Sequence, residues 1–350
     1  MDPQWLPCWQ DTLDKSRQST GKSDVFEIEK PDLFMSVVVP AYNEENRLAG
    51  MLEETANYLE HAYGTLADEY EDKTANKENG KPVEKARKRK ANGKSNGRVP
   101  DGPSTSKGWE IIIVSDGSTD KTVDTSFSFT RDHQLSLHPK GRAGPWTPNS
   151  HEGVHIPPGT IRVVTLEQNR GKGGAVTHGM RHVRGEYVVF ADADGASKFD
   201  DLGKLVSACQ DVEDSQKRGV AVGSRAHLVD SEAVVKRSKL RNFLMHSFHL
   251  ILRFLTPPAT ASIKDTQCGF KLFSRASLPY IVPNMHCEGW IFDVEMLMLA
   301  EFAGIPVAEV PVGWREVTGS KLNVIWDSLG MAWGLAVLRA AWSFGIYKRT

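Results

Sequence analysis

Two aspartates separated by one residue, Asp192 and Asp194, follow a short apolar run and precede a glycine. Carboxylate oxygens at this spacing are hard ligands of the kind that Mg²⁺ or Mn²⁺ prefers. Because Mg²⁺ usually takes one or two carboxylates together with substrate phosphates, the pair could hold a metal that in turn holds a diphosphate. Asp and Gly also recur in ordinary turns, so the spacing alone does not distinguish a metal site from a turn.

Two further polar segments have residues suited to a nucleotide. Asp116 is followed by Gly-Ser-Thr-Asp, which could cap a helix or place a carboxylate beside a nucleotide base. Residues 169–175 read Asn-Arg-Gly-Lys-Gly-Gly-Ala, and combine glycines that allow close backbone approach with two cations that favour phosphate. The spacing is neither G-x-x-x-x-G-K-[ST] nor G-x-G-x-x-G, which disfavours nucleotide hydrolysis and dinucleotide redox chemistry.

Each polar segment follows a short run of apolar, often β-branched residues. Such runs predict strands covered on both faces, at 34–40, 110–115, 161–166, 187–191 and 220–223. Apolar residues at helical spacing predict helices between them, at 45–61, 175–183 and 202–212. Strands alternating with helices predict an α/β fold with a mostly parallel twisted sheet, whose ligands gather beyond the carboxyl ends of the strands.

The composition adds limits on the fold and its partners. The 350 residues carry 43 Lys+Arg and 44 Asp+Glu, for a net charge of −1, which argues against a chain-wide polyanion-binding surface. Residues 68–107 predict a disordered basic insert, and the Pro-rich residues 131–158 predict a second surface insert. The folded domain is then expected at 33–324, after an N-terminal segment 1–32. The four widely spaced cysteines indicate neither a zinc site nor a disulfide framework.

Two stretches have the composition of helices that lie in a membrane interface. The first forty residues contain no apolar run long enough for a signal peptide or a spanning helix. Residues 242–255 and 328–338 are apolar stretches with aromatic residues, flanked or interrupted by cations, and each is too short to span a bilayer. The second lies in the C-terminal segment 325–350, which is expected to form a membrane-interface helix. The alternative is that both are buried helices of the core.

In their order and spacing, the polar segments resemble those of the family-2 inverting glycosyltransferases of the GT-A fold. The second half is similar to the dolichyl-phosphate β-glucosyltransferases of the endoplasmic reticulum, and residues 192–199 (Asp-Ala-Asp-Gly-Ala-Ser-Lys-Phe) are close to that family's metal motif. The other segments that carry this likeness are 222–228, 265–273, 292–295 and 319–322. The resemblance covers nearly all of the chain outside residues 1–32 and the two inserts.

The resemblance implies that the chain transfers glucose from UDP-glucose to dolichyl phosphate with inversion, for assembly of the N-linked glycan precursor. It also implies Mg²⁺ or Mn²⁺ as cofactor, and the cytosolic face of the endoplasmic reticulum membrane as location. Members of the family usually begin with one spanning segment. Either such a segment is missing from this sequence, or attachment relies on the interfacial stretches.

The resemblance also assigns roles to individual residues. The expected donor contacts are Pro40, Tyr42 and Glu44 at the uridine, Asp116 at the uracil, Lys172 near the nucleotide, and Asp192 at the ribose or metal. Asp194 would ligate the metal directly. The expected catalytic residues are Asp194, Gln267 as a metal-side or donor contact, and Asp293 at the position of a base in many relatives. The candidates for the acceptor phosphate are Arg225, Arg237, Arg241, Ser320 and Lys321, although Arg237 and Arg241 could equally be solvated helix positions.

The chemistry of the acceptor limits what Asp293 needs to do. A phosphate monoester, with a second pKa near ~6, is already largely dianionic at neutral pH and needs little help from a base. We therefore expect Asp293 to position groups or to act only as a secondary base, and Asp194 to matter more.

Two alternatives remain open at this point. A dolichyl-phosphate mannosyltransferase using GDP-mannose would share the sheet and the metal, but it matches less well at 192–199 and 265–273. A nucleic-acid-binding protein could act through residues 81–98, which hold eight Lys/Arg and one Glu. We expect no nucleic-acid partner. A processive polysaccharide synthase is disfavoured because the chain has no Q-x-x-R-W segment.

Overall fold

The computed structural model describes residues 7–20, 26, 28–64, 107–150, 152–228, 252, 254–317 and 324–347. Several predictions concern residues outside these ranges, so the structure does not address them. They are the basic insert 68–107 apart from its last residue, the basic run 81–98, most of the stretch 242–255, and the acceptor candidates Arg237, Arg241, Ser320 and Lys321.

A seven-stranded sheet runs through the centre of the molecule, in the order β3-β2-β1-β4-β6-β5-β7. The strands are β1 (Leu33–Ala41), β2 (Trp109–Asp116), β3 (Ile161–Leu166), β4 (Gly185–Ala191), β5 (Val220–Ser224), β6 (Phe270–Ser274) and β7 (Val307–Pro311). β6 pairs antiparallel with β4 and β5, and the other four pairings are parallel. The predicted mixed, mostly parallel sheet is therefore confirmed.

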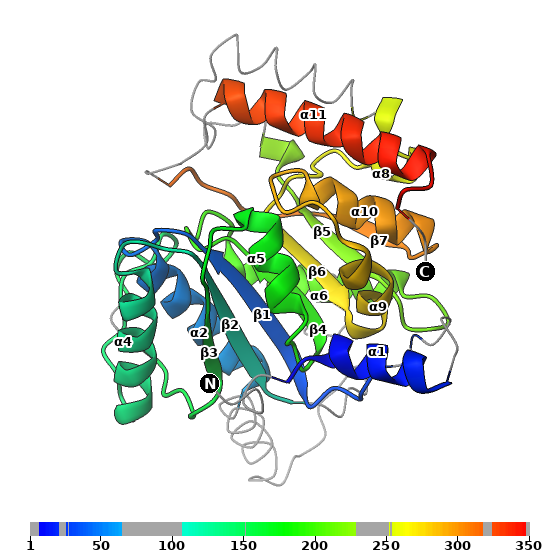
Figure 1. Cartoon of the computed structure of the whole chain (residues 1–350). Helices are drawn as coiled ribbons and strands as arrows, with labels where there is room; N and C mark the ends of the chain where they lie inside the picture. Colours follow the sequence, from blue (N-terminus) through cyan, green and yellow to red (C-terminus); the bar gives the residue numbers. More distant parts are fainter. Residues whose placement is uncertain are drawn as a thin grey trace, which may run out of the picture.

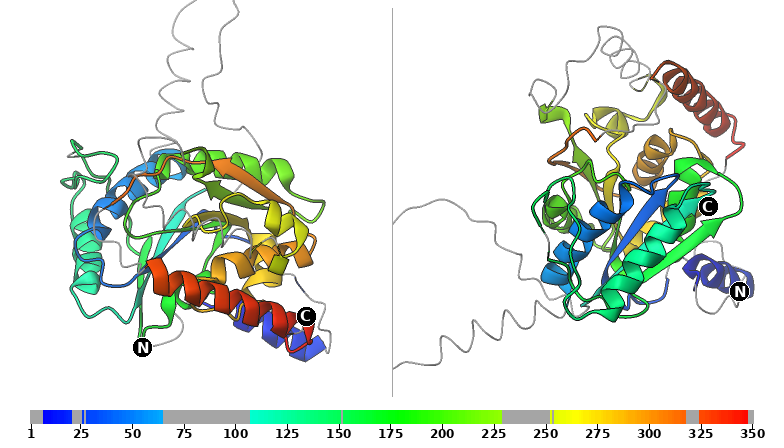
Figure 2. Two further views of the ribbon diagram at one scale, coloured as in Figure 1. Left: turned by 90° about the horizontal axis from the view of Figure 1, so that it is seen from above. Right: turned by 90° about the vertical axis from the view of Figure 1, so that its left-hand side faces the viewer.

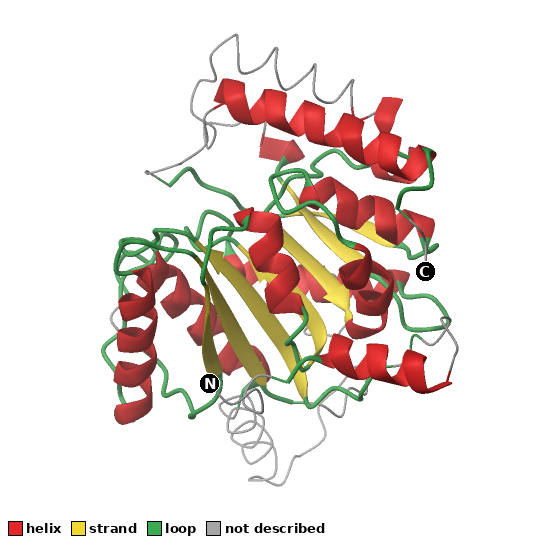
Figure 3. Cartoon of the chain, in the orientation of Figure 1, coloured by secondary structure: helices red, strands yellow, loops and turns green. Residues whose placement is uncertain are grey.

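Helices cover both faces of this sheet, as Figures 1 and 3 show. One face packs against α2 (Leu48–Tyr63), α4 (Thr122–Leu135) and α6 (Leu202–Val212), and the other against α1 (Trp9–Thr20), α5 (Gly171–Met180), α9 (Leu278–Ile281) and α10 (Phe292–Phe302). The other α-helices in the described ranges are α8 (Pro258–Ser262) and α11 (Val324–Ser343). Because both faces are covered, β1 and β2 are buried along nearly their whole length, which explains their continuous apolar runs.

The predicted elements differ from the structure at two places that matter for function. α5 begins at Gly171, four residues before the prediction, so the glycine-rich segment forms its first turn. The predicted Pro-rich insert 131–158 is instead part of the fold. Residues 131–135 form the end of α4, and Val154 and Ile156 in the loop after them are buried in the core on the same face of the sheet as α2 and α4.

α11 packs on α10 at the periphery of the fold (Figure 2). Leu335 and Leu338 are buried against Val294 and Met298 of α10, whereas Trp333 on another side of α11 is 73% exposed. Within the described part of the chain, no helix has both the length and the apolar character that crossing a bilayer would require.

Candidate active site

The acidic pair lies at the carboxyl edge of the sheet. Asp192 directly follows β4, and Lys172 stands in the first turn of α5, the helix that follows β3. The structure brings these residues together, with Lys172 Nζ 2.6 Å from Asp192 Oδ1. Lys172 Nζ also lies 5.9 Å from the ring centres of Trp290 and Phe292, so its ammonium is enclosed between a carboxylate and two aromatic faces.

Asp194 is oriented by the turn that contains it. The backbone N–H of Ala196 donates to Asp194 Oδ1 at 3.0 Å. Gly195 between them has a φ of +68°, a left-handed conformation that side chains rarely adopt, which explains the glycine after the second aspartate. The other carboxylate oxygen, Oδ2, faces the Arg47 guanidinium at 3.9 Å, which is beyond hydrogen-bond distance.

Burial and the neighbouring charge of Asp192 raise the pKa of Asp194 above its ordinary value. Burial lowers the pKa of Lys172, but Asp192 and Asp293 outweigh this effect and raise it overall, so the lysine stays charged. Two carboxylates thus stand close together in a partly desolvated turn with one fixed ammonium beside them. A further cation at Asp194 would offset this repulsion.

The donor set fits a divalent cation that shares its coordination with a substrate. Among the described residues, no group of three or more His, Cys, Asp or Glu side chains is arranged to hold a metal. Two carboxylates are nevertheless the usual protein contribution to a Mg²⁺ site that is completed by phosphate oxygens and water. Since Lys172 engages Asp192, Asp194 is the residue best placed to ligate a cation.

The predicted uracil contact and the glycine-rich turn form one unit. Asp116 Oδ1 accepts a hydrogen bond from the backbone N–H of Arg170 at 2.7 Å, and Asn169 Nδ2 donates to the Asp116 carbonyl at 3.0 Å. The turn is also held from the other side, because Arg170 forms an ion pair with Glu288 and Gly174 N donates to the Glu288 carbonyl at 3.1 Å. Burial raises the pKa of Asp116 despite these bonds.

The segment after β1 borders the same edge. Pro40 lies in the last part of β1, and the ring of Tyr42, the next but one residue, is 41% exposed. Glu44 turns its carboxylate to Arg47, with contacts of 2.6 and 2.7 Å. Arg47, which the sequence analysis missed, therefore stands between Glu44 and Asp194. The spacing of three residues between Glu44 and Arg47 could have indicated this ion pair from the sequence.

Asp293 is enclosed in the core. Its side chain is almost completely buried and forms an ion pair with the fully buried Lys271, whose ammonium also donates to the Cys268 carbonyl at 2.7 Å. Burial raises the pKa of Asp293, and Lys271 and Lys172 partly oppose this effect. A carboxylate held in this way is suited to orienting Lys271 and Lys172.

The model for "Glycosyl transferase family 2" matches residues 150–279. The chain is 39% identical to the dolichyl-phosphate beta-glucosyltransferase of Saccharomyces cerevisiae, over 91% of this chain and 77% of that one. It is 35% identical to the enzyme of the same name from Homo sapiens, over 91% of this chain and 79% of that one. The chain belongs to the dolichyl-phosphate β-glucosyltransferase family. It is thus a glycosyltransferase, and its α/β architecture is that of the GT-A fold.

Among solved structures, the mannosyl-3-phosphoglycerate synthase of Rubrobacter xylanophilus is 14% identical, with a TM-score of 0.49 over 96% of this chain and 79% of that one.

Two residues with predicted ligand contacts in this glycosyltransferase also have partners within the chain. Arg225, expected at the acceptor phosphate, binds Asp265 through both Nε and Nη2, at 2.7 and 2.8 Å. Burial lowers the pKa of Arg225, but the pairing with Asp265 outweighs this effect and raises the pKa overall. Gln267, expected near the metal or donor, donates to the sulfur of Met331 on α11 at 2.9 Å. Arg225 therefore anchors the 265–269 segment, and Gln267 joins that segment to α11.

The same segment approaches the acidic pair through Gly269. A Cβ atom at this position would lie 2.0 Å from Asp192 Oδ2, so only glycine leaves room for the carboxylate. The backbone N–H of Asp192 also donates to the Gly269 carbonyl at 3.2 Å. The Cys-Gly step in this glycosyltransferase's 265–273 motif thus shapes the space in which Asp192 lies.

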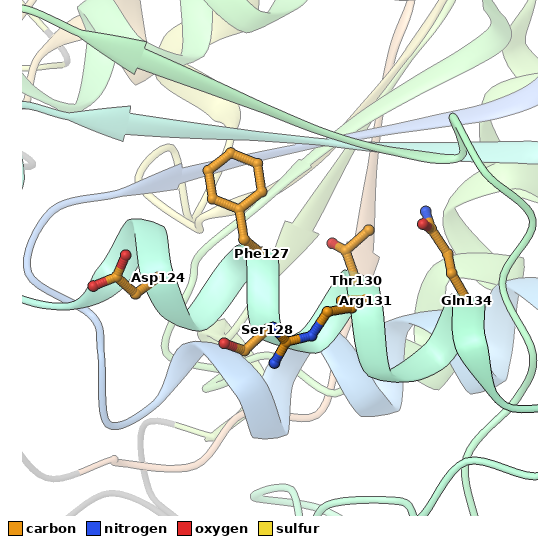
Figure 4. A pocket seen from close by; sticks show the side chains of 6 residues that line it. All are labelled: Asp124, Phe127, Ser128, Thr130, Arg131 and Gln134. Carbon is orange, nitrogen blue, oxygen red and sulfur yellow. The ribbon is translucent and has the colours of Figure 1, made fainter.

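A hollow on the surface of the enzyme lies along α4 (Figure 4). Its lining residues are Asp124, Phe127, Ser128, Thr130, Arg131 and Gln134. None of them belongs to the site described above.

Proposed function

We propose that this chain transfers glucose from UDP-glucose to dolichyl phosphate, giving dolichyl β-D-glucosyl phosphate and UDP. The observation that carries the proposal is the 39% identity to a dolichyl-phosphate beta-glucosyltransferase over 91% of the chain. The geometry supports it, because an acidic pair, a lysine and a glycine-rich helix start meet at one sheet edge, where a sugar nucleotide's diphosphate could be neutralised.

In the proposed reaction, an oxygen of the acceptor phosphate attacks the anomeric carbon of glucose. The attack comes from the face opposite UDP. The bond between that carbon and the β-phosphate oxygen of UDP breaks, and UDP leaves with the bonding electrons, so the configuration inverts. Lys172 would contribute positive charge near the diphosphate. The acceptor is already dianionic and the Asp293 carboxylate is buried against Lys271, so we assign Asp293 to positioning these charges.

A divalent cation, Mg²⁺ or Mn²⁺, would be held by Asp194 with Asp192 beside it. When bound, it would offset the negative charge that develops on the departing diphosphate. The raised pKa of Asp194 supports this assignment, since a neighbouring cation would relieve the unfavourable burial of its charge.

We further propose that α11 rests on the cytosolic surface of the endoplasmic reticulum membrane. Leu329, Trp333 and Val337 recur every fourth residue and are 56%, 73% and 44% exposed, which gives α11 an apolar outer stripe. Its inner side packs on α10, the helix that contains Asp293. A polyprenol headgroup in the bilayer would thereby come close to the donor site.

The test uses purified protein in detergent with dolichyl phosphate and divalent cation. Labelled UDP-glucose and labelled GDP-mannose are supplied in parallel, and label is counted in a mild-acid-labile lipid. We expect label from UDP-glucose alone. Label from GDP-mannose instead would identify a mannosyltransferase and overturn the proposal. Deletion of residues 68–107 should leave transfer intact, whereas a protein acting through the basic run would lose its function.

A further inference from the structure

The loop between α4 and β3 contacts the turn that contains Asp192 and Asp194 and holds this turn in place. Residues 142–147 of this loop, here called the brace, lie across α2. Glu54 of α2 accepts hydrogen bonds at its Oε1 from the backbone N–H groups of Trp146 and Thr147, at 2.6 and 2.8 Å, and from the Thr147 hydroxyl at 3.0 Å. Glu54 is buried, so these three donors replace the water that its carboxylate has lost.

A second buried glutamate holds the start of the brace. Glu53 accepts the backbone N–H of Arg142 at 3.0 Å and lies 3.2 Å from His133 Nε2. Gly144 allows the close approach to α2, because a Cβ there would lie 2.2 Å from Glu54 Oε1. The brace is thus anchored at both ends by groups inside the core.

From this fixed position, Trp146 contacts the turn that carries Asp194. Trp146 Nε1 donates to the Gly195 carbonyl at 3.0 Å. That carbonyl and the N–H of Ala196 belong to the same planar peptide group. The same N–H donates to Asp194 Oδ1 at 3.0 Å, so the indole fixes the peptide plane that orients the carboxylate.

The segment after β7 encloses this turn on another side. The backbone N–H of Arg315 donates to the Ala196 carbonyl at 3.0 Å. The Arg315 guanidinium donates to the Pro145 carbonyl and lies 5.8 Å from the centre of the Trp146 ring. Arg315 therefore helps to hold both the indole and the turn in place.

We propose that Trp146 is a positioning residue for Asp194, which acts through the Gly195–Ala196 peptide to aim the carboxylate at a divalent cation. This inference rests on the metal role that the proposed function gives to Asp194. Partners that orient a metal ligand typically change metal affinity by about 10- to 100-fold when removed. Trp146 does not contact Asp194 directly but acts through the peptide group between them, so we expect a change in metal affinity at the lower end of this range, about 10-fold.

The test compares Trp146→Phe with Trp9→Phe. The first variant keeps an aromatic ring but loses the bond to the Gly195 carbonyl. The second loses a similar bond, from Trp9 Nε1 to the Met180 carbonyl at 2.7 Å, on α1. Binding of Mn²⁺ by the whole protein is titrated in the presence of UDP, with unbound Mn²⁺ measured by electron paramagnetic resonance, and thermal midpoints are recorded for each variant.

We expect Trp146→Phe to weaken Mn²⁺ binding about 10-fold and Trp9→Phe to leave it unchanged. In transfer assays, Trp146→Phe should raise the Mn²⁺ concentration for half-maximal rate while kcat at saturating Mn²⁺ is largely kept. Unaltered Mn²⁺ binding in Trp146→Phe, or equal weakening in Trp9→Phe, would overturn the inference. Mn²⁺ binding is measured without glucosyl transfer, so the inference and the proposed reaction can fail separately. If the proposed reaction is wrong, the wild-type protein will bind Mn²⁺ and UDP but make no glucolipid.

Discussion

Replacing Gly269 with alanine tests whether the position of Asp192 controls the reaction. The added Cβ would lie 2.0 Å from Asp192 Oδ2 and 2.3 Å from its Cγ, both within van der Waals contact distance. The carboxylate must then move by about 1 Å, and a misplacement of that size in an active site can cost about 100-fold in rate. Such a movement would also disturb the 2.6 Å ion pair with Lys172.

We therefore expect Gly269→Ala to lower kcat/KM for UDP-glucose about 100-fold, measured as initial rates with dolichyl phosphate at saturation. The fold should remain intact, because Gly269 is not among the glycines with positive φ. Gly330→Ala is the control for an added methyl group, since in the part of the chain that the structure describes no atom outside its own helix lies within 4 Å of that Cβ. Its rate should match that of the wild type.

A double-mutant cycle identifies the cause of the loss. If Gly269→Ala acts only by displacing Asp192, it should have little further effect in an Asp192→Ala background. Full additivity of the two losses, or a Gly269→Ala protein with wild-type kcat/KM, would refute the reasoning.

Three other outcomes follow from buried charges and exposed apolar surface. Asp293→Asn leaves the Lys271 ammonium buried without its ion pair, so the substitution should lower the free energy of unfolding by about 3–5 kcal/mol, measured by denaturant titration. An unchanged denaturation midpoint would contradict a stabilising ion pair between Asp293 and Lys271. Burial lowers the pKa of His133, but its hydrogen bonds to Glu53 and to a backbone carbonyl outweigh this and raise the pKa above its usual value of about 6.5. The resulting stabilisation is complete below about pH 6.5 and is lost as pH rises through the folded-state pKa of His133. As pH rises from about 6.5 through this pKa, the thermal midpoint should therefore fall more steeply in wild type than in His133→Gln. Parallel curves of thermal midpoint against pH would contradict a stabilising charge on His133. Trp333→Glu should reduce flotation with anionic liposomes without altering the thermal midpoint, whereas equal flotation would argue against α11 as the membrane-facing element.

The first five strands were predictable because each is a short apolar run. β6 was missed because Lys271 interrupts its run, and only the structure shows that Asp293 from α10 neutralises this lysine inside the core. β7 was missed because it is mostly half-buried, so it lacks both a continuous apolar run and a clear alternation. Sequence patterns report local burial, whereas the pairing of a buried charge depends on a partner distant in the chain.

The candidate site was also predictable only in part, because some of its contacts depend on partners distant in the chain. Asp192 and Lys172 were expected at one edge of the sheet, and the structure brings them into contact because the carboxyl ends of parallel strands share that edge. The bidentate contact of Arg225 with Asp265 was not predicted, because it depends on tertiary packing that spacing does not report. Trp146 was overlooked because its Pro-rich surroundings were interpreted as a surface insert, whereas Glu54 fixes that segment to α2.

The proposed reaction depends most directly on the carboxylate of Asp194. The decisive measurement is the rate of glucosyl transfer from UDP-glucose to dolichyl phosphate by Asp194→Asn, at saturating Mn²⁺ and with equal amounts of folded protein. Because the pKa of Asp194 is raised by burial and by Asp192, removing its charge should leave the thermal midpoint unchanged or higher. We expect such a stable protein to lose at least about 100-fold in rate, as when a key electrostatic group is removed. A stable Asp194→Asn protein that transfers glucose at the wild-type rate would contradict the account.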